Sequence, residues 1–400
     1  MIEVGIVMPV YKQKREYLSA AIKSILNQTF KQFRFIIVID GDTEMLKLSK
    51  QLVGEDPRVE FIVNEVNLGV AKALNRGFDV LFADPRMKYV TWVSSDNIYY
   101  PQFISVLRHA LARCPREVGL VYSSFCSIDG EDRSLDTEQT LALLRQYQSQ
   151  PREALLDACI TGVSFMYKSQ YAKQIEGYYL EPVEDYEYWL RLTELCDIKY
   201  IPVELVDYRV NSTFSISATL QTTDNHRKWR YAYHLARYEA RMRRGIAPLV
   251  TVLFSVKQLD EQGIACLESL YEQSFSNYEL HILDCSSDRV ATYEISKIAH
   301  PTVTYRFFPH VDEEKAIFYA SQFTKTPLTF VLGKEPLSQH LLMETLVREL
   351  STKTPDYMSN YFTQDNLIGY RKYENDDKPY FNELFRTVHF FAYQIKKHLV

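Results

Sequence analysis

Four acidic residues stand at positions from which a carboxylate can do chemistry. Asp40 and Asp96 lie at or just after the ends of apolar runs, and Glu184 and Asp185 directly precede an expected helix. A carboxylate can accept a hydrogen bond, hold a hard divalent cation or serve as a general base. Local roles stay open as well: Asp40 can cap a turn with Gly41, Asp96 can be structural, and the acidic pair can cap its own helix.

A second candidate is the segment 67–77, which surrounds the start of an expected helix. The free backbone N–H groups and the dipole at a helix N-terminus suit an anion. Lys72 could add a positive charge there, although a lone lysine on a helix surface is more often solvated. The sequence contains neither GxxxxGK[ST] nor GxGxxG, which counts against a P-loop NTPase or a nicotinamide enzyme.

Strands and helices must alternate to position these residues. Apolar runs that predict strands lie at residues 4–10, 33–39, 59–63, 89–93 and 118–122, with amphipathic or helix-forming segments between them. This alternation predicts a mostly parallel sheet with helices on both faces, an α/β fold of the Rossmann-like kind. Ligands bind at the carboxyl ends of such strands, so the loops after Val10, Asp40 and Ser94 are the ones that matter.

Length and composition restrict the classes of protein. The chain has 400 residues, of which 46% are hydrophobic and 24% charged, so we expect two soluble globular domains. The net charge of −5 argues against a nucleic-acid partner. Six scattered cysteines without a CxxC pair suggest a reducing compartment, and neither a signal peptide nor an apolar run of about 18 residues is seen. We therefore expect a cytoplasmic protein.

The second half echoes the first. The runs VMPV, LNQTF and FIIVID at residues 7–10, 26–30 and 35–40 are matched in order by LFSV, YEQSF and LHILDC at residues 253–256, 271–275 and 280–285. We expect a catalytic domain over residues 1–223, a basic helix and linker over 224–247, and a smaller α/β domain over 248–400 that repeats the first in altered form. Chance similarity of two strand–helix units is the alternative.

Two helices outside the catalytic half carry further expectations. The helix expected near residues 224–245 is rich in arginine, so it could lie on an anionic membrane surface or form a solvated face. The stretch 380–400 has Leu384, Phe385, Val388 and Phe391 at helical spacing, and we expect it to be a packing helix rather than an anchor.

Several segments of the first half together resemble the family 2 glycosyltransferases of the GT-A fold. The segments are PVY (9–11), SILNQTF (24–30), IVIDGD (37–42), NLG (67–69) with ALNRG (73–77), SSDNIYYP (94–101) and EDYEYWLRL (184–192). Each one alone is a weak signal, but their order across roughly residues 1–215 is a strong one. The resemblance implies the GT-A fold and an inverting, nucleotide-sugar-dependent transferase.

The resemblance also implies roles for individual residues. The positions expected to contact the nucleotide-sugar donor are Pro9, Val10, Tyr11, Asp40, Asn67, Gly69, Lys72, Asn75, Ser95 and Asp96. Asp40 would contact the base, and Asp96 would coordinate Mn²⁺ or Mg²⁺ with the diphosphate. Asp185 would be the catalytic base, with Glu184 as the alternative.

The chain departs from the family at two metal-linked positions. Ser94 stands where the family carries its first aspartate, and Asn211 stands where a histidine near the metal is common. One true carboxylate therefore remains, and we expect weak metal binding. In the second half we expect no donor binding, because Cys285 falls opposite Asp40 and Lys334 opposite Asp96.

We therefore expect a glycosyltransferase that uses a UDP-sugar, or next a dTDP-sugar, in the synthesis of a surface polysaccharide. The expected acceptor is a saccharide or a lipid-linked acceptor, with peripheral contact at the inner face of the membrane and a homo-oligomer as open possibilities. A non-catalytic scaffold or carbohydrate-binding partner with the same fold is the main alternative, and Ser94 and Asn211 favour it. A nucleotidyltransferase would need a glycine-rich signature after the first strand, which is missing.

Overall fold

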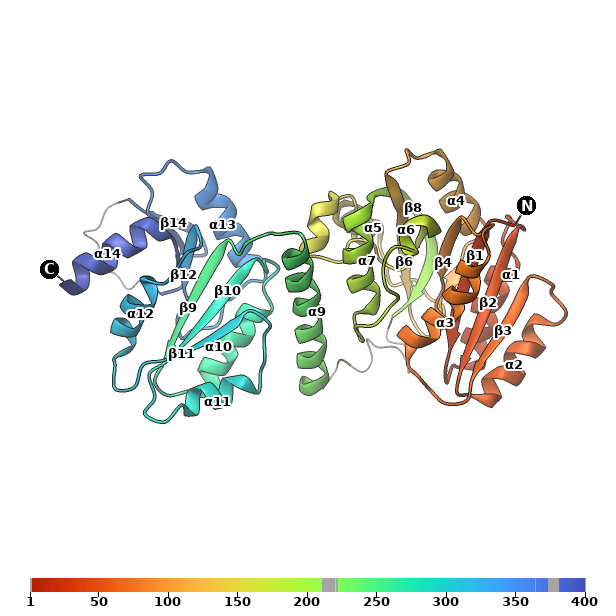
Figure 1. Ribbon diagram of the computed structural model, residues 1–400. Helices are drawn as coiled ribbons and strands as arrows, with labels where there is room; N and C mark the ends of the chain where they lie inside the picture. The colour runs from red at the N-terminus through yellow and green to blue at the C-terminus, as the bar shows by residue number, and fades with distance from the viewer. Residues whose placement is uncertain (1, 211–219, 221, 364, 373–380, 400) are drawn as a thin grey trace. The chain divides into compact units, whose positions relative to one another are not determined.

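The computed structural model describes residues 2–210, 220, 222–363, 365–372 and 381–399, so Asn211 lies outside the described residues. The chain divides into two compact units, residues 1–236 and 237–400. The division falls inside the long helix α9 (Thr223–Arg243), which runs through the green part of the chain in Figure 1.

An eight-stranded sheet forms the centre of the N-terminal unit, in the order β3-β2-β1-β4-β7-β6-β8-β5. Its strands are β1 (Val4–Val10), β2 (Phe33–Asp40), β3 (Val59–Asn64), β4 (Tyr89–Trp92), β5 (Ile98–Tyr99), β6 (Val118–Ile128), β7 (Phe165–Lys168) and β8 (Asp197–Arg209). Strands β1 to β4 pair in parallel, whereas β7 is antiparallel to both of its neighbours. The predicted α/β fold with a mostly parallel sheet is confirmed.

Helices cover both faces of this sheet. They are α1 (Arg15–Leu26), α2 (Thr43–Val53), α3 (Val70–Ala83), α4 (Phe103–Arg113), α5 (Glu138–Gln148), α6 (Ser169–Ala172) and α7 (Glu184–Leu195), with a 3₁₀ turn at Arg152–Leu156. Alternate residues of β1 and β2, such as Ile6 and Ile37, pack in one core with α1 and α4. The residues between them, such as Val7, face α3 on the other side.

Close packing of α3 fixes where its N-terminus lies. A Cβ on Gly77 would come within 2.4 Å of a Val7 methyl group, so glycine lets the helix approach β1 directly. On the same face Trp189 of α7 packs against Phe165 of β7, with ring centroids 4.6 Å apart. The starts of α3 and α7 are thereby brought to the edge of the sheet at which β1, β2 and β4 end.

The C-terminal unit repeats this arrangement in a seven-stranded sheet, in the order β11-β10-β9-β12-β15-β13-β14. Its strands are β9 (Val250–Val256), β10 (Tyr278–Asp284), β11 (Val303–Phe307), β12 (Leu328–Val331), β13 (Ser359–Phe362), β14 (Ile368–Arg371) and β15 (Glu383–Arg386). Its helices are α10 (Glu261–Tyr271), α11 (Val290–Ser296), α12 (Glu313–Ser321), α13 (Leu342–Thr352) and α14 (Thr387–Leu399). Strands β11, β10, β9 and β12 correspond to β3, β2, β1 and β4, and β15, like β7, is antiparallel to its neighbours.

Strand register corrects one expected equivalence. Strand β1 pairs Val4 with Tyr89, and β9 pairs Val250 with Leu328, so Trp92 corresponds to Val331. Counting onward puts Lys334 at the position of Ser95 and Glu335 at that of Asp96. The expected match of Lys334 with Asp96 is wrong by one residue, because it requires Val93, rather than Trp92, to be the counterpart of Val331. The register does place Cys285 at the position of Asp40.

The arginine-rich helix α9 and the C-terminal segment differ in part from what the sequence predicted. Arg230, Arg237 and Arg241 of α9 are buried, so these three are not free to meet a membrane. At the C-terminus Leu384 and Phe385 belong to strand β15, and Val388 of α14 is 74% exposed, whereas Phe390 and Tyr393 are buried. The expected packing face of that segment was therefore wrong. Over the described ranges, none of the helices has the length and apolarity that a membrane crossing requires.

Candidate active site

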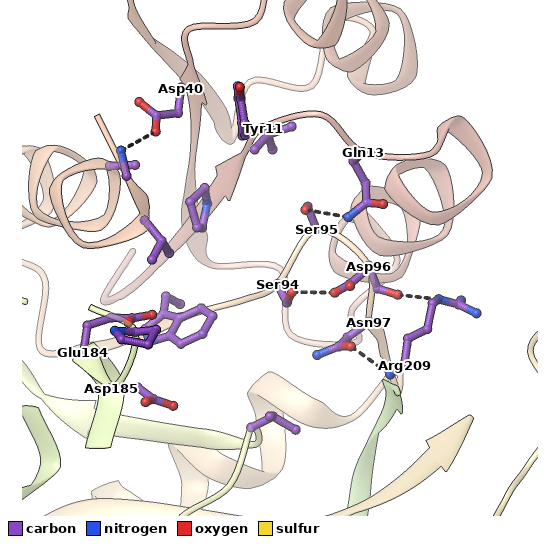
Figure 2. A pocket seen from close by; sticks show the side chains of 18 of the residues that line it. Tyr11, Gln13, Asp40, Ser94, Ser95, Asp96, Asn97, Glu184, Asp185 and Arg209 are labelled. Carbon is purple, nitrogen blue, oxygen red and sulfur yellow. Dashed lines mark hydrogen bonds between the residues drawn. The ribbon is translucent and has the colours of Figure 1, made fainter. Parts of the chain in front are cut away.

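A cavity of about 490 Å³ opens in the N-terminal unit at the carboxyl ends of β1, β2 and β4. Figure 2 shows Asp40 and Tyr11 at one end, Ser94 to Asn97 along one side, and Glu184 with Asp185 on the other. The predicted site residues that line it are Pro9, Val10, Tyr11, Asp40, Asn67, Gly69, Ser95, Asp96, Glu184 and Asp185. Lys72 and Asn75 are not among its lining residues.

Asp40 organises the loop between β3 and α3. Its Oδ1 accepts hydrogen bonds from Asn64 Nδ2 (2.6 Å) and Leu68 N (3.0 Å), and its Oδ2 accepts one from Gly69 N (3.0 Å). The carboxylate is 3% exposed. A carboxylate has about four acceptor positions, so these three bonds leave room for one donor from the cavity side. Its neighbour Asp42 is the residue that caps helix α2.

The N-terminus of α3, expected to face an anion of the ligand, already holds an anion of the chain. Glu181 Oε1 accepts a hydrogen bond from Ala71 N at 2.9 Å. Gly69 sits at φ +92°, and a Cβ on it would lie 2.6 Å from the same oxygen, so glycine is required there. Glu181 therefore satisfies a free N–H of the first turn, as a helix cap does.

The structure gives Asn75 a task other than contact with a ligand. Its side-chain amide donates to Tyr178 O (2.8 Å) and accepts from Tyr178 N (2.7 Å). Together with Glu181 it fastens α3 to the segment that leads into α7. Lys72 is exposed on the surface of α3.

The loop after β4 is held from several sides. Ser94 Oγ donates to Asp96 Oδ1 (2.5 Å), and Gln13 Nε2 donates to Ser95 Oγ (3.3 Å). Arg209 Nε donates to the backbone oxygen of Asp96 (3.1 Å), as Figure 2 shows. The Arg209 guanidinium is 1% exposed and lies 3.9 Å from the centre of the Tyr17 ring. The backbone at Asp96 is therefore fixed independently of any ligand.

The residues around Asp96 fit a divalent cation for which the protein supplies only a few of the ligands. Asn97 Oδ1 is already occupied by Arg209 N (3.0 Å). Within the described ranges, no group of three or more His, Cys, Asp or Glu side chains is arranged to hold a metal. Magnesium-type ions are often bound through one or two carboxylates plus substrate phosphates. Asp96 supplies one such carboxylate, so a cation would depend on the ligand's phosphate oxygens.

Glu184 and Asp185 start α7 on the opposite wall. Burial, and next the charge of Asp185, raise the pKa of Glu184 to about 8. Glu184 is 4% exposed, and its Oε2 has no hydrogen-bond partner among the described residues. Asp185 is partly exposed and accepts a hydrogen bond from Tyr186 N (2.6 Å), while burial raises its pKa. Glu184 therefore holds its proton more strongly than an exposed glutamate does, and Asp185 is the more accessible carboxylate.

The residues of this site that sequence reasoning missed include Glu181 and Arg209, which position its loops, and Trp92 and Trp229, which line it. Trp229 of α9 stacks on Tyr233, with ring centroids 5.0 Å apart, and Tyr233 stacks on Tyr186 of α7 at 4.5 Å. Arg209 lies two positions before Asn211, and Trp229 lies within the arginine-rich helix. Neither spacing nor composition connects them to the cavity.

The chain is similar to a known protein family and to curated proteins. The model of the family described as "Glycosyl transferase family 2" matches residues 5–176. An uncharacterized glycosyltransferase of Methanocaldococcus jannaschii is 28% identical over 214 residues, which are 52% of this chain and 70% of that protein.

Two solved structures are similar at 12% identity and a TM-score of 0.44. They are Staphylococcus aureus TarS residues 1–349 in complex with UDP-GlcNAc, and a mannosyltransferase of Pyrobaculum calidifontis in complex with GDP-Man and Mn²⁺. The matches cover 58% and 60% of this chain, and 66% and 64% of those chains. Residues 5–176 of the N-terminal unit match the model of glycosyl transferase family 2.

Proposed function

We propose that the N-terminal unit transfers a sugar from a nucleotide diphosphate sugar to an acceptor hydroxyl with inversion at the anomeric carbon. The observation that carries the proposal is the placement of Asp96 and Asp185 on the walls of one cavity. One carboxylate is available at the diphosphate side and another at the acceptor side. A single in-line displacement requires these two functions to face each other across one sugar ring.

Asp185 is the proposed base. It is partly exposed to the cavity, whereas Glu184 is buried beside it. An acceptor hydroxyl becomes acidic as the new C–O bond forms, so a carboxylate suffices to remove its proton. Glu184, with a pKa raised to about 8 chiefly by burial, would hold its proton and donate a hydrogen bond in the same cavity.

Asp40 is the proposed contact to the nucleotide base. Its remaining acceptor position suits the imide N–H of uracil or thymine, so a UDP-sugar is the first choice of donor and a dTDP-sugar the second. Tyr11 and Asn67 line the cavity beside it, and a hydrogen bond with Asn67, then one with Lys12, lowers the pKa of Tyr11.

Mn²⁺ or Mg²⁺ is the proposed cofactor, held by Asp96 together with diphosphate oxygens. When bound, such an ion neutralises negative charge that develops on the leaving diphosphate. Ser94 and Arg209 contribute by fixing the carboxylate and the backbone of Asp96.

The wider setting follows from the proposed chemistry. We propose a saccharide or a lipid-linked acceptor and a role in surface polysaccharide synthesis at the cytoplasmic side. Membrane contact by α9 would rest on its exposed cations, such as Lys228 and Arg243, because three of its arginines are buried. Oligomer formation remains a prediction.

A panel of nucleotide sugars tests the proposal, with and without Mn²⁺, on wild type and the isosteric variant Asp185→Asn. We expect both proteins to bind one donor of the panel and only wild type to hydrolyse or transfer its sugar. Glu184→Gln serves as the matched control and should keep measurable turnover. Binding without turnover in wild type, or the absence of nucleotide binding in both proteins, would favour the non-catalytic scaffold.

A further inference from the structure

A second cavity of about 610 Å³ lies at the other end of the same sheet. Tyr89, the first residue of β4, lines it, whereas Trp92 at the last position of β4 lines the candidate active site. The two cavities therefore open at opposite ends of this strand. Nothing in the proposed transfer reaction uses the second one.

Four cationic side chains converge on this cavity from four segments. Lys88 precedes β4, Arg116 lies between α4 and β6, Lys168 ends β7, and Lys173 follows α6. Among its lining residues, all of which the structure describes, none is acidic. The whole chain carries a net charge of −5, so such a group of like charges is not a consequence of composition.

The chain's own carboxylates neutralise the positive charges of this cavity only in part. Lys88 Nζ lies 3.4 Å from a Glu3 carboxylate oxygen, but Glu3 also pairs with Arg108, so one carboxylate serves two cations. Lys168 Nζ is oriented by the carbonyl oxygens of Pro115 (3.2 Å) and Arg116 (3.3 Å).

The other two cations have no acidic partner. Over the described ranges, no carboxylate comes within ion-pair distance of Arg116 or Lys173, and the ammonium of Lys173 lies 5.8 Å from the centre of the Phe82 ring. Bringing like charges together without counter-charges costs free energy, which a bound anion with several charged oxygens would offset.

We propose that this cavity binds a phosphate-bearing ligand that carries at least two negative charges. Lysine ammonium groups and a guanidinium fork are the side chains that proteins use for phosphate oxygens. The concave wall formed by four chain segments suits a discrete phosphate ester or phosphodiester group. Such a group can come from a soluble phosphate compound or from a lipid headgroup, and the binding chemistry is the same.

Titration with tripolyphosphate by calorimetry tests the proposal on the full chain. The variant Arg116→Gln/Lys173→Gln removes two exposed cations from the cavity. Lys23→Gln/Lys50→Gln removes the same charge from exposed positions on α1 and α2 and is the matched control. We expect the cavity variant to bind at least tenfold more weakly and the control to bind within twofold of wild type. Equal weakening in both variants, or none in the cavity variant, would overturn the proposal.

A second arm separates the two sources of phosphate. Flotation with vesicles of phosphatidylglycerol and phosphatidylcholine is compared with vesicles of phosphatidylcholine alone. Loss of flotation in the cavity variant, with retention in the control, assigns a lipid headgroup. Equal flotation of all three proteins, together with the calorimetric difference, assigns a soluble phosphate ligand. Because both readouts measure binding, failure of the proposed transferase activity would leave them interpretable.

Discussion

Glu181 accepts a hydrogen bond from the backbone N–H of Ala71, 110 positions earlier in the chain, at 2.9 Å. The bond joins the first turn of α3, beside Asp40, to the segment that leads into Glu184 and Asp185. A carboxylate at a helix N-terminus satisfies a free N–H and interacts favourably with the helix dipole. Glu181 is thus a positioning residue for both walls of the site.

We expect Glu181→Ala to destabilise the N-terminal unit by about 1 kcal/mol, as loss of an N-cap commonly does, and to lower its melting temperature by roughly 2–4 °C. Glu181→Gln, which keeps an acceptor oxygen, should lose less than half of that. Thermal unfolding followed by circular dichroism measures the effect. Glu176→Ala removes an exposed acid from the same segment and should unfold like wild type. Equal losses in the Ala variants at 176 and 181 would contradict the capping role.

The burial of Glu184 predicts an unusual dependence of stability on pH. Burial raises the pKa of Glu184 to about 8, above its ordinary value of 4.5, so the folded chain keeps a proton that the unfolded chain loses. Stability from this group therefore falls as pH rises from about 4.5 to about 8 and changes little above that. This direction is the reverse of that for a salt-bridged carboxylate.

Glu184→Gln should remove the loss of stability that occurs as pH rises. We expect the variant to melt roughly 5 °C above wild type at pH 8.5 and at nearly the same temperature at pH 4.5. Scanning calorimetry across this pH range measures the difference, with Glu187→Gln as a comparison that instead breaks the buried pair with Arg191 (2.6 Å). A difference between Glu184→Gln and wild type that stays constant with pH would show that the carboxyl is not buried as described.

Local patterns in the sequence predicted the fold and the edge of the sheet at which the site lies. Apolar runs such as that of β1, separated by helical spacing, predicted parallel strands, and the loops at their carboxyl ends contain Tyr11, Asp40 and Asp96. Register was less accessible, because valines end apolar runs in both halves. The alignment of Val93 with Val331 therefore slipped by one residue, a slip that the strand pairing exposes.

Contacts between distant segments were beyond sequence reasoning. Arg209 bonds the backbone of Asp96 from 113 positions away, and Asn75 bonds Tyr178 from 103 positions away. A single sequence contains no signal for such pairs, because each residue type is ordinary at its own position. The exposed side of α14 was also hidden: Val388 and Phe391 have helical spacing but are exposed, whereas Phe390 and Tyr393 are buried.

We expect the chain to bind one nucleotide, because the second unit should not bind a second one. Cys285 stands at the position of Asp40, and Lys334 Nζ pairs with Glu313 at 2.9 Å where the first unit has Ser95. Of the three positions compared, the one that corresponds to Asp96 keeps a carboxylate in the second unit, that of Glu335. We expect calorimetry with UDP and Mn²⁺ to give one site, and Glu335→Ala to leave its affinity within twofold. Two sites, or a clear loss in Glu335→Ala, would assign the second unit a donor site of its own.

Restoring the missing acid at Ser94 tests how the cation is held. The Ser94 hydroxyl donates to Asp96 Oδ1 at 2.5 Å, so the two side chains already face one another. Ser94→Asp places a second carboxylate there, and we expect Mn²⁺ to bind about tenfold more tightly in the presence of UDP, equivalent to about 1.4 kcal/mol. Ser94→Asn has the same size without the charge and should show no gain. Electron paramagnetic resonance of free Mn²⁺ measures the affinity of both Ser94 variants.

Asp96→Ala should abolish the Mn²⁺-dependent rise in melting temperature of the UDP complex. An Asp96→Ala protein that keeps this rise would place the cation elsewhere.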